Sequence, residues 1–462
     1  MAQHTTTTHP NRAAAAARRK AQLLSALLHQ EASWLGCTEP TLCHQASKRL
    51  HEEDPTSQAT MQCKSSADLG LHQAEYARSQ HELGLTETHQ QVHLPRLVQY
   101  DLYHLLDALP ENRDHAALDG VHSFFYRADA QRELLQHLEF YQQYEVVPCL
   151  LWHASNPLWG AASFDAIKPL NPFALKGEAD ELALLQFVAD HIHWPRADWP
   201  TDWTDQQVAV LGTMQDKLDR LADFAHQLAD RGIVALFRPY HEANGHWFWW
   251  SNLHFATEKT DDPTYTAVIW HHTRRYLEKV KGVDNLLYTW SPNIMGSWLT
   301  AEDEALATAY SHGVNVNEVD VLGIDCYANN LVKAVPAGPD FREQALGEAL
   351  TVLAKLRTLF PDHPVGFTEL GASYHKLLPG DDPAAAFAGA GRGAATFSKA
   401  LRWRFADPNL LPPHFTIFWR NEPGLLEFPV TGCSPEMDAV VADFYPYFAT
   451  REVALPASGL VL

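Results

Sequence analysis

Short apolar runs alternate with longer amphipathic stretches through most of this 462-residue chain. The short runs have the length and composition of buried strands, whereas the longer stretches repeat apolar residues with helical spacing. Strands separated by helices imply a parallel sheet that is covered on both faces. The strand candidates are residues 67–72, 96–102, 146–153, 233–242, 285–293, 319–327, 364–369 and 415–421.

Eight such strands predict an α/β fold of the closed (β/α)8 type, the TIM barrel. Helical patterns cover residues 216–232, 264–282 and 341–361, and Gly232 and Gly282 stand where helix C-caps are expected. A doubly wound open sheet is the alternative. That fold usually carries a glycine-rich phosphate loop after its first strand, and the sequence has no GxGxxG or GxxxxGK[ST] motif.

The N-terminal stretch differs in composition from the rest, being rich in Thr, Ala, Gln and His. We predict an N-terminal extension over residues 1–65, partly disordered or helical, with residues 12–33 as the helical candidate, and a barrel domain over residues 66–462. The six cysteines form no CxxC pair, so free thiols are expected. A disulfide within the N-terminal stretch is the alternative.

The charge balance restricts the partners. The 56 acidic residues outnumber the 35 basic ones, giving a formal charge of -21 that disfavours nucleic acid and anionic lipid. A neutral or cationic ligand fits this surface, and solubility alone also explains it. No run reaches the roughly 18 apolar residues of a membrane span, and the N-terminus lacks a signal-peptide layout, so the default expectation is cytoplasmic.

Most of the predicted strands end in polar or aromatic side chains. The C-terminal strand ends of a barrel meet at one face, where active sites are built, whereas polar residues with only structural roles would be scattered. The strand-end residues are His72, His153, His241 with Glu242, Asn293, Tyr327, Glu369, and Trp419 with Asn421.

Two of these residues are glutamates on opposite sides of the predicted barrel mouth. Glu242 ends the fourth strand and Glu369 the seventh. Glycoside hydrolysis requires a protonated carboxyl group that donates to the leaving oxygen and an ionised one that attacks or activates water. A lone Glu after a strand is more commonly a helix cap or a surface charge, but both residues here are flanked by apolar runs. The pair therefore favours catalysis.

A metal site is the competing interpretation of this region. The segment "HEANGH" has the spacing HExxxH, and Pro239 and Gly245 disfavour the helix on which zinc proteases place HExxH. No GxSxG elbow of a serine hydrolase occurs either. No metal or other cofactor is therefore expected. A metal-dependent hydrolase using His153, His241 and His246 stays open to a chelator test. Calcium binding in the acidic loop "GDDP" (380–383) is only weakly indicated.

The segment "RPYHEANGHWFWW" (238–250) resembles the acid/base signature of glycoside hydrolase family 26, typified by endo-β-1,4-mannanases. The resemblance covers about residues 67–448 in the family's order. It implies a retaining glycoside hydrolase that cleaves internal β-1,4-mannosidic bonds of mannan or galactomannan. We expect a monomer acting on polysaccharide. Members of the family are often exported, in contrast to the cytoplasmic default given above. The other matching segments are "LLWHASNP", "LGIDCY", "GFTELG", "FWRNE" and, more loosely, "LGLHQ" and "PRLVQYDL".

The resemblance also implies roles around the two carboxyl groups. Glu242 would be the general acid/base and Glu369 the nucleophile. His241 would contact the nucleophile or the sugar, and Arg238 would orient a carboxylate through its forked donors. Tyr327 would hydrogen-bond Glu369.

Other side chains would bind substrate. His153 and Asn244 would hydrogen-bond the sugar, while Trp247 and Trp419 would stack on sugar rings. Some aromatic residues have a simpler interpretation as barrel packing, namely Phe248, Trp249 and Trp250. Tryptophans after the third strand would make outer subsites or fix that loop to the barrel; these are Trp159, Trp194, Trp199 and Trp203.

The resemblance leaves the substrate open. Family members also act on β-1,3-xylan and mixed-linkage β-glucan, so the same fold and mechanism on another backbone is the main alternative. A non-catalytic carbohydrate-binding barrel is the second, although both glutamates are present.

Overall fold

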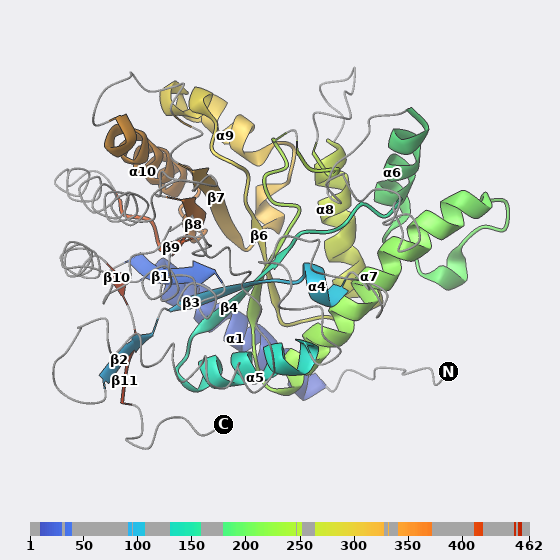
Figure 1. The fold of residues 1–462 in the computed structure, drawn as a ribbon, viewed down its shortest axis with the longest axis horizontal. Helices are drawn as coiled ribbons and strands as arrows, with labels where there is room; N and C mark the ends of the chain where they lie inside the picture. The colour runs from blue at the N-terminus through green and yellow to red at the C-terminus, as the bar shows by residue number, and fades with distance from the viewer. Residues whose placement is uncertain are drawn as a thin grey trace, which may run out of the picture.

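The computed structural model has parallel strands at its centre and helices arranged around them (Figure 1). None of the helices in the described part of the chain combines the length and the hydropathy that a membrane span requires. The residues that the structure describes are 10–29, 33–38, 91–94, 96–106, 130–158, 179–245, 247–251, 264–327, 331, 341–371, 411–418, 448–449 and 451–454.

Eight parallel strands within these ranges form a closed (β/α)8 barrel, as predicted. Each strand pairs in parallel with the next, and β1 pairs with β9 to close the ring. The barrel strands are β1 (Ser33–Thr38), β3 (Leu97–Asp101), β4 (Val147–Trp152), β5 (Ala235–Pro239), β6 (Leu286–Trp290), β7 (Val321–Tyr327), β8 (Val365–Gly371) and β9 (Phe415–Phe418).

Two smaller pairings accompany the barrel. β10 (Phe448–Ala449) pairs in parallel with β1, and β2 (Gln91–Leu94) pairs antiparallel with β11 (Arg451–Ala454) in a separate ribbon. The helices are α1 (Pro10–Leu28), α4 (Tyr103–Leu106), α5 (Ala130–Gln143), α6 (Ala179–His191), α7 (Asp205–Asp230), α8 (Tyr265–Arg275), α9 (Asp303–Ser311) and α10 (Phe341–Leu359), with short turns η4 (Arg196–Asp198), η6 (Tyr276–Val280), η7 (Gly296–Thr300) and η8 (Val316–Glu318).

Local sequence signals fix the ends of the long helices. The side chain of Thr204 accepts a hydrogen bond from the backbone of Gln207, and the Gln207 side chain bonds back, forming a capping box at the start of α7. Gly232 follows α7 with φ 73°, and Gly282 follows η6 with φ 68°. This left-handed conformation is the one that glycine supplies after a helix, so both predicted caps are confirmed.

Seven of the eight predicted strands match observed strands, but the position predicted for the first barrel strand is wrong. The first barrel strand is β1, which lies between β3 and β9, whereas residues 67–72 lie outside the described residues. The sequence of β1, "SWLGCT", has too few β-branched residues to indicate a strand by itself, and pairing with two neighbours decides its conformation. The boundary predicted after residue 65 is corrected accordingly, because β1 belongs to the barrel.

Helix α1 also packs against the barrel. Leu27 is fully buried in a cluster with residues near the N-terminal ends of the strands, and Leu23 and Leu24 pack against the same cluster. A Cβ at Gly232, in the loop before β5, would overlap the Arg19 side chain, so α1 lies close to that loop. The helix covers the end of the barrel opposite to the C-terminal strand ends.

The barrel interior changes character from one end to the other. Apolar side chains fill the end near α1; they include Leu97, Leu236, Leu287, Val321 and Phe415. Buried polar side chains follow further along the strands; they include Gln99, Arg238, Ser291, Asp325 and Thr368. Cys149 and Cys326 are buried free thiols, as expected. The polar layer leads directly to the C-terminal strand ends.

Candidate active site

The loop after β5 places Glu242 with an unusual backbone. Tyr240 and Glu242 have φ values of 52° and 50°, a conformation that is uncommon for residues other than glycine. The backbone N–H of Glu242 donates to the Ser291 carbonyl at 2.8 Å, and its own carbonyl accepts from Gly245 at 2.8 Å. These bonds hold a strained turn, which fixes the position of the Glu242 side chain just beyond the C-terminal end of β5.

Glu242 is buried and stays protonated more readily than an ordinary glutamate. Its pKa is raised well above the usual value, first by burial and then by the nearby charges of Asp325 and Glu369. The indole N–H of Trp247 donates to its Oε2 at 2.7 Å and partly opposes this shift. A Cβ at Gly245 would overlap the Trp247 ring, so glycine there lets the indole fold onto Glu242. The group is suited to donate a proton near neutral pH.

Glu369, at the end of β8, accepts two hydrogen bonds from different strands. Arg238 of β5 donates to Oε1 through Nη2, and the Tyr327 hydroxyl of β7 donates to Oε2 at 2.6 Å. A Cβ at Gly371 would overlap the Tyr327 ring, so this glycine gives the phenol its place beside β8. Both carboxylate oxygens are engaged, which fixes the orientation of the side chain.

Arg238 links Glu369 to a second buried carboxylate. Its Nη1 donates to Asp325 at 2.6 and 2.7 Å. Ser291 and Thr368 also donate to Oδ1 of Asp325, at 2.8 and 2.7 Å. Burial and Glu369 raise the pKa of Asp325 to about 7, while Arg238 and the two hydroxyl groups oppose the rise. The guanidinium therefore stands between two carboxylates in a region from which water is excluded.

Two histidines lie beside these groups. The rings of His153 and His241 meet edge to face, with centroids 4.3 Å apart. Burial, His153 and Arg238 lower the pKa of His241 well below its usual value, so it is neutral at physiological pH. Nδ1 of His153 lies 2.6 Å from Oδ2 of Asp101, the last residue of β3.

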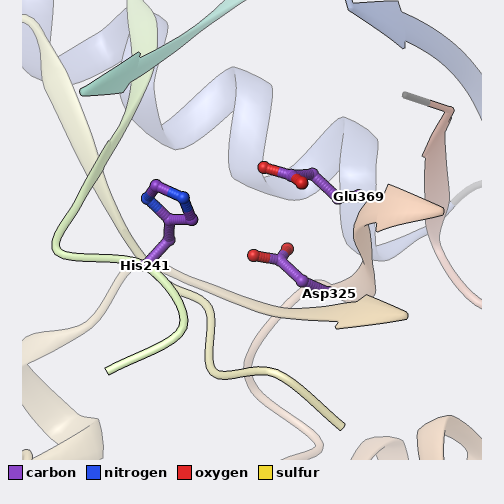
Figure 2. Close-up of side chains that lie close together, drawn as sticks. All are labelled: His241, Asp325 and Glu369. Atoms are coloured by element: carbon purple, nitrogen blue, oxygen red, sulfur yellow. The ribbon is translucent and has the colours of Figure 1, made fainter. Parts of the chain in front are cut away.

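His241, Asp325 and Glu369 form a grouping that could hold a metal ion among the described residues. One ligand atom from each lies within 4.8 Å of the others, and Figure 2 shows the two carboxylates beside the His241 ring. The Arg238 guanidinium already bonds both carboxylates, so it supplies the positive charge that a cation would bring. The geometry thus favours an ion-paired site. His246 lies outside the described residues.

Asn244 is used differently from the expected sugar contact. Its Nδ2 donates to the Asn293 carbonyl at 2.7 Å, and its Oδ1 accepts from the Asn293 N–H at 2.9 Å. The side chain thereby ties the loop after β5 to the loop after β6. Only one N–H of the amide is left for a ligand.

Of the four consecutive aromatic residues after β5, one is exposed and three are packed in the core. Trp247 is 40% exposed, whereas Phe248, Trp249 and Trp250 are buried in the core. The indole N–H of Trp250 donates to the His241 carbonyl at 2.8 Å, which supports the strained loop. The interpretation of these three residues as barrel packing is confirmed. Trp419 lies outside the described residues.

Three tryptophans of the segment after β4 pack on one another. The rings of Trp194 and Trp199 lie 5.8 and 5.7 Å from Trp203, and Phe187 of α6 lies 4.8 Å from it. The cluster therefore joins α6 to the start of α7. Trp159 lies outside the described residues.

Sequence reasoning missed Asp101, Ser291 and Asp325. Asp101 closes its strand and shows the same strand-end signal as the residues that were selected. Asp325 lies two residues before Tyr327, so the alternation of a strand places both on the same side. Ser291 directly follows β6. The strand ends that hold Asp101 and Ser291, and the alternation that pairs Asp325 with Tyr327, could both be found in the sequence.

Comparison with known proteins finds a family model that covers the segment containing this site. The sequence model described as Glycosyl hydrolase family 26 matches residues 201–374, a segment that includes both Glu242 and Glu369. Over this segment the chain is similar to glycoside hydrolase family 26. The resemblance seen in the sequence is thereby confirmed.

Curated relatives match the chain over a limited length. The chain is 32% identical over 110 residues to a mannan endo-1,4-beta-mannosidase of Bacillus subtilis, covering 24% of this chain and 28% of that protein. It is 37% identical over 120 residues to one from Bifidobacterium adolescentis, covering 25% of this chain and 11% of the relative. The alignments thus span about a quarter or less of these relatives.

Solved family 26 structures match over nearly the whole chain. GH26C from Muricauda sp. MAR_2010_75 aligns with a TM-score of 0.57 and 16% identity, covering 95% of this chain and 91% of that one. The catalytic domain of a Bacillus sp. JAMB-750 GH26 endo-beta-1,4-mannanase aligns with a TM-score of 0.57 and 20% identity, covering 93% and 91%. At this identity the likeness establishes the shared fold.

Proposed function

We propose that this protein is a retaining glycoside hydrolase that cleaves internal β-1,4-mannosidic bonds of mannan or galactomannan. The observation that carries the proposal is the contrast between two neighbouring carboxyl groups. Burial and negative neighbours hold Glu242 in its protonated form, whereas Glu369 accepts bonds from a guanidinium and a phenol. One acid and one nucleophile within a single site are what double displacement needs.

In the first step, Glu369 attacks the anomeric carbon and forms a glycosyl ester. The glycosidic C–O bond breaks, and Glu242 passes its proton to the leaving oxygen. A retaining enzyme places its two carboxyl groups roughly 5–5.5 Å apart, and we predict this spacing for Glu242 and Glu369. Trp247 keeps its hydrogen bond to Glu242 throughout and orients the proton donor.

In the second step, ionised Glu242 takes a proton from water, and the water oxygen attacks the anomeric carbon. The ester bond breaks and Glu369 is released as a carboxylate. The charge of Glu369 is one cause of the raised pKa of Glu242. Ester formation removes that charge, so the pKa of Glu242 falls when the residue must become a base.

Further side chains complete the proposed site. Arg238 and Tyr327 hold the nucleophile, and His241 lies beside it as a neutral ring. We assign His153 and the remaining N–H of Asn244 to sugar hydroxyl groups. Trp247 offers an exposed face to a sugar ring, and Trp419 is proposed as a second aromatic platform. We propose that the protein acts as a monomer without a cofactor.

The choice of mannan is supported by the relatives, which are named as mannan endo-1,4-beta-mannosidases. Purified protein should be incubated with linear mannan, galactomannan, β-1,3-xylan and mixed-linkage β-glucan. We expect oligosaccharides and a rapid fall in viscosity with the two mannans, unchanged by chelator. Hydrolysis restricted to xylan or glucan would overturn the substrate, and loss of activity with chelator would favour a metal enzyme.

Two variants test the catalytic assignments within the same assay. Glu369→Ala should lower kcat by more than about 10⁴-fold while oligosaccharide binding persists. Glu242→Ala should keep much of its first step on an aryl mannoside whose leaving group needs no proton. Substantial mannan hydrolysis by the Glu369 variant would contradict the mechanism, and no hydrolysis of any glycan by the wild type would indicate a binding protein.

A further inference from the structure

Asp101 is a buried carboxylate that the mechanism above does not use. It is the last residue of β3, and only 3% of its surface is exposed. Oδ2 lies 2.6 Å from Nδ1 of His153, and Oδ1 accepts a bond from the His153 backbone N–H at 3.3 Å. One carboxylate therefore contacts both the backbone and the ring of the residue that follows β4.

This contact determines which ring nitrogen of His153 carries a proton. An ionised carboxylate has only acceptor sites, so Nδ1 must be the donor in a bond of this length. In that tautomer, Nε2 is the ring nitrogen that can accept a hydrogen bond from a ligand. The same logic applies where a carboxylate orients a metal-binding histidine.

The surroundings of His153 limit where the ring can turn. His241 meets it edge to face at 4.3 Å, and Phe248 lies 5.6 Å away with an interplanar angle of 66°. The His153 side chain keeps 16% of its surface exposed. The ring is thus held between a carboxylate and two aromatic neighbours, with part of it open to solvent.

We propose that Asp101 is a positioning residue that fixes the tautomer and orientation of His153 for recognition of a sugar hydroxyl by Nε2. The nature of the ligand rests on the proposed function, whereas the tautomer does not. A purely structural Asp101 would stabilise the fold without acting through the His153 ring. The two roles differ in measurable ways.

The tautomer is tested first, without any substrate. Long-range ¹H–¹⁵N spectra of protein labelled at histidine should show His153, assigned by its loss in His153→Ala, protonated at Nδ1. Asp101→Ala should shift the signal towards a mixture of tautomers. An Nε2-protonated neutral ring in the wild type, or a spectrum unchanged in the variant, would overturn the proposal.

A double-mutant cycle on mannan oligosaccharide tests the functional half. Asp101→Ala is expected to lower kcat/KM about 10–100-fold, the loss usual when the partner orienting a functional histidine is removed. Asp101→Asn should recover part of this loss, because its carbonyl can still accept from Nδ1. In a His153→Ala background, Asp101→Ala should cost no more than about 2-fold further.

A matched control separates positioning from stability. Asp320, just before β7, accepts a bond from the Tyr288 N–H at 2.8 Å and lies at the opposite end of the barrel. Asp320→Ala removes this acceptor and should lower Tm, leave kcat/KM unchanged and leave the His153 spectrum unaltered. Losses for Asp101→Ala and His153→Ala that multiply in the double variant would contradict a role through His153.

Failure of the positioning role and failure of the proposed function give different experimental results. If the wild type cleaves no glycan while Nδ1 of His153 is protonated only when Asp101 is present, the function fails and the orienting contact stands. If the wild type is active and the cycle is multiplicative, the positioning role fails alone. If Asp101→Ala does not fold, Asp101→Asn takes its place in the cycle. Its loss in kcat/KM should be smaller, and it should disappear in the His153→Ala background.

Discussion

The indole N–H of Trp247 donates to Oε2 of Glu242 at 2.7 Å and connects the exposed face of the site to its proton donor. This bond lowers the pKa of Glu242 against the larger effect of burial. Trp247→Phe keeps an aromatic face and removes the donor, so the pKa of Glu242 should rise further. We expect the alkaline limb of kcat/KM to move to higher pH, with about a 10-fold loss in kcat.

The pH profiles of kcat/KM check this expectation when the wild type, which has the indole donor, is compared with Trp247→Phe, which lacks it. Glu242→Gln serves as the control, because it has no titrating group and should lack that limb altogether. An alkaline limb that stays in place in Trp247→Phe would mean that another group sets it.

The raised pKa of Glu242 also predicts a cost in stability. A carboxyl group whose folded pKa lies above its unfolded value stabilises the fold at low pH and loses that contribution as pH rises towards the folded pKa. Glu242→Gln should therefore melt at a higher temperature than the wild type above about pH 5, with no gain near pH 3. Equal Tm differences at both pH values would exclude this linkage.

Tyr327 contributes one of the two bonds to the proposed nucleophile. Tyr327→Phe removes a hydrogen bond to a charged group, worth about 1.5–3 kcal/mol, so kcat should fall about 10–100-fold with little change in Tm. Gly371→Ala should lower kcat similarly, because its methyl group would displace the ring of Tyr327. Kinetics of both variants on one mannan oligosaccharide provide the test; a kcat within 2-fold of wild type in Tyr327→Phe would argue against the role.

Leu27 tests the correction at the N-terminus. Its side chain is fully buried against the apolar end of the barrel. Leu27→Ala should reduce the free energy of unfolding by about 2–5 kcal/mol. Denaturant unfolding measures this, and kcat of the folded protein should not change. A loss below about 0.5 kcal/mol would indicate that α1 does not support the barrel.

The sequence predicted seven strand positions because buried strands and amphipathic helices differ in period. It missed β1 because "SWLGCT" carries no clear alternation and depends on two distant partners. The strand-end rule found Glu242, Glu369 and Tyr327, which do meet at one face. It could not tell that Asn244 bonds the backbone of Asn293, since an amide suits a sugar equally well.

Electrostatic roles were harder to foresee than positions. Arg238 was expected to orient a carboxylate, and it bonds two, Glu369 and Asp325. The second partner comes from inside a strand that reads as apolar. The protonation of each carboxyl group depends on its burial and on charged residues from three different strands. Local sequence shows neither the burial nor these neighbours.

The most direct test of the paired carboxyl groups is the location of the covalent intermediate. The protein should be treated with a 2-deoxy-2-fluoro mannosyl fluoride, digested and analysed by peptide mass spectrometry. We expect one adduct, on the peptide containing Glu369, with none in Glu369→Ala. An adduct on Glu242 or another carboxylate would contradict the assignment, as would an adduct-free protein whose first product has inverted anomeric configuration.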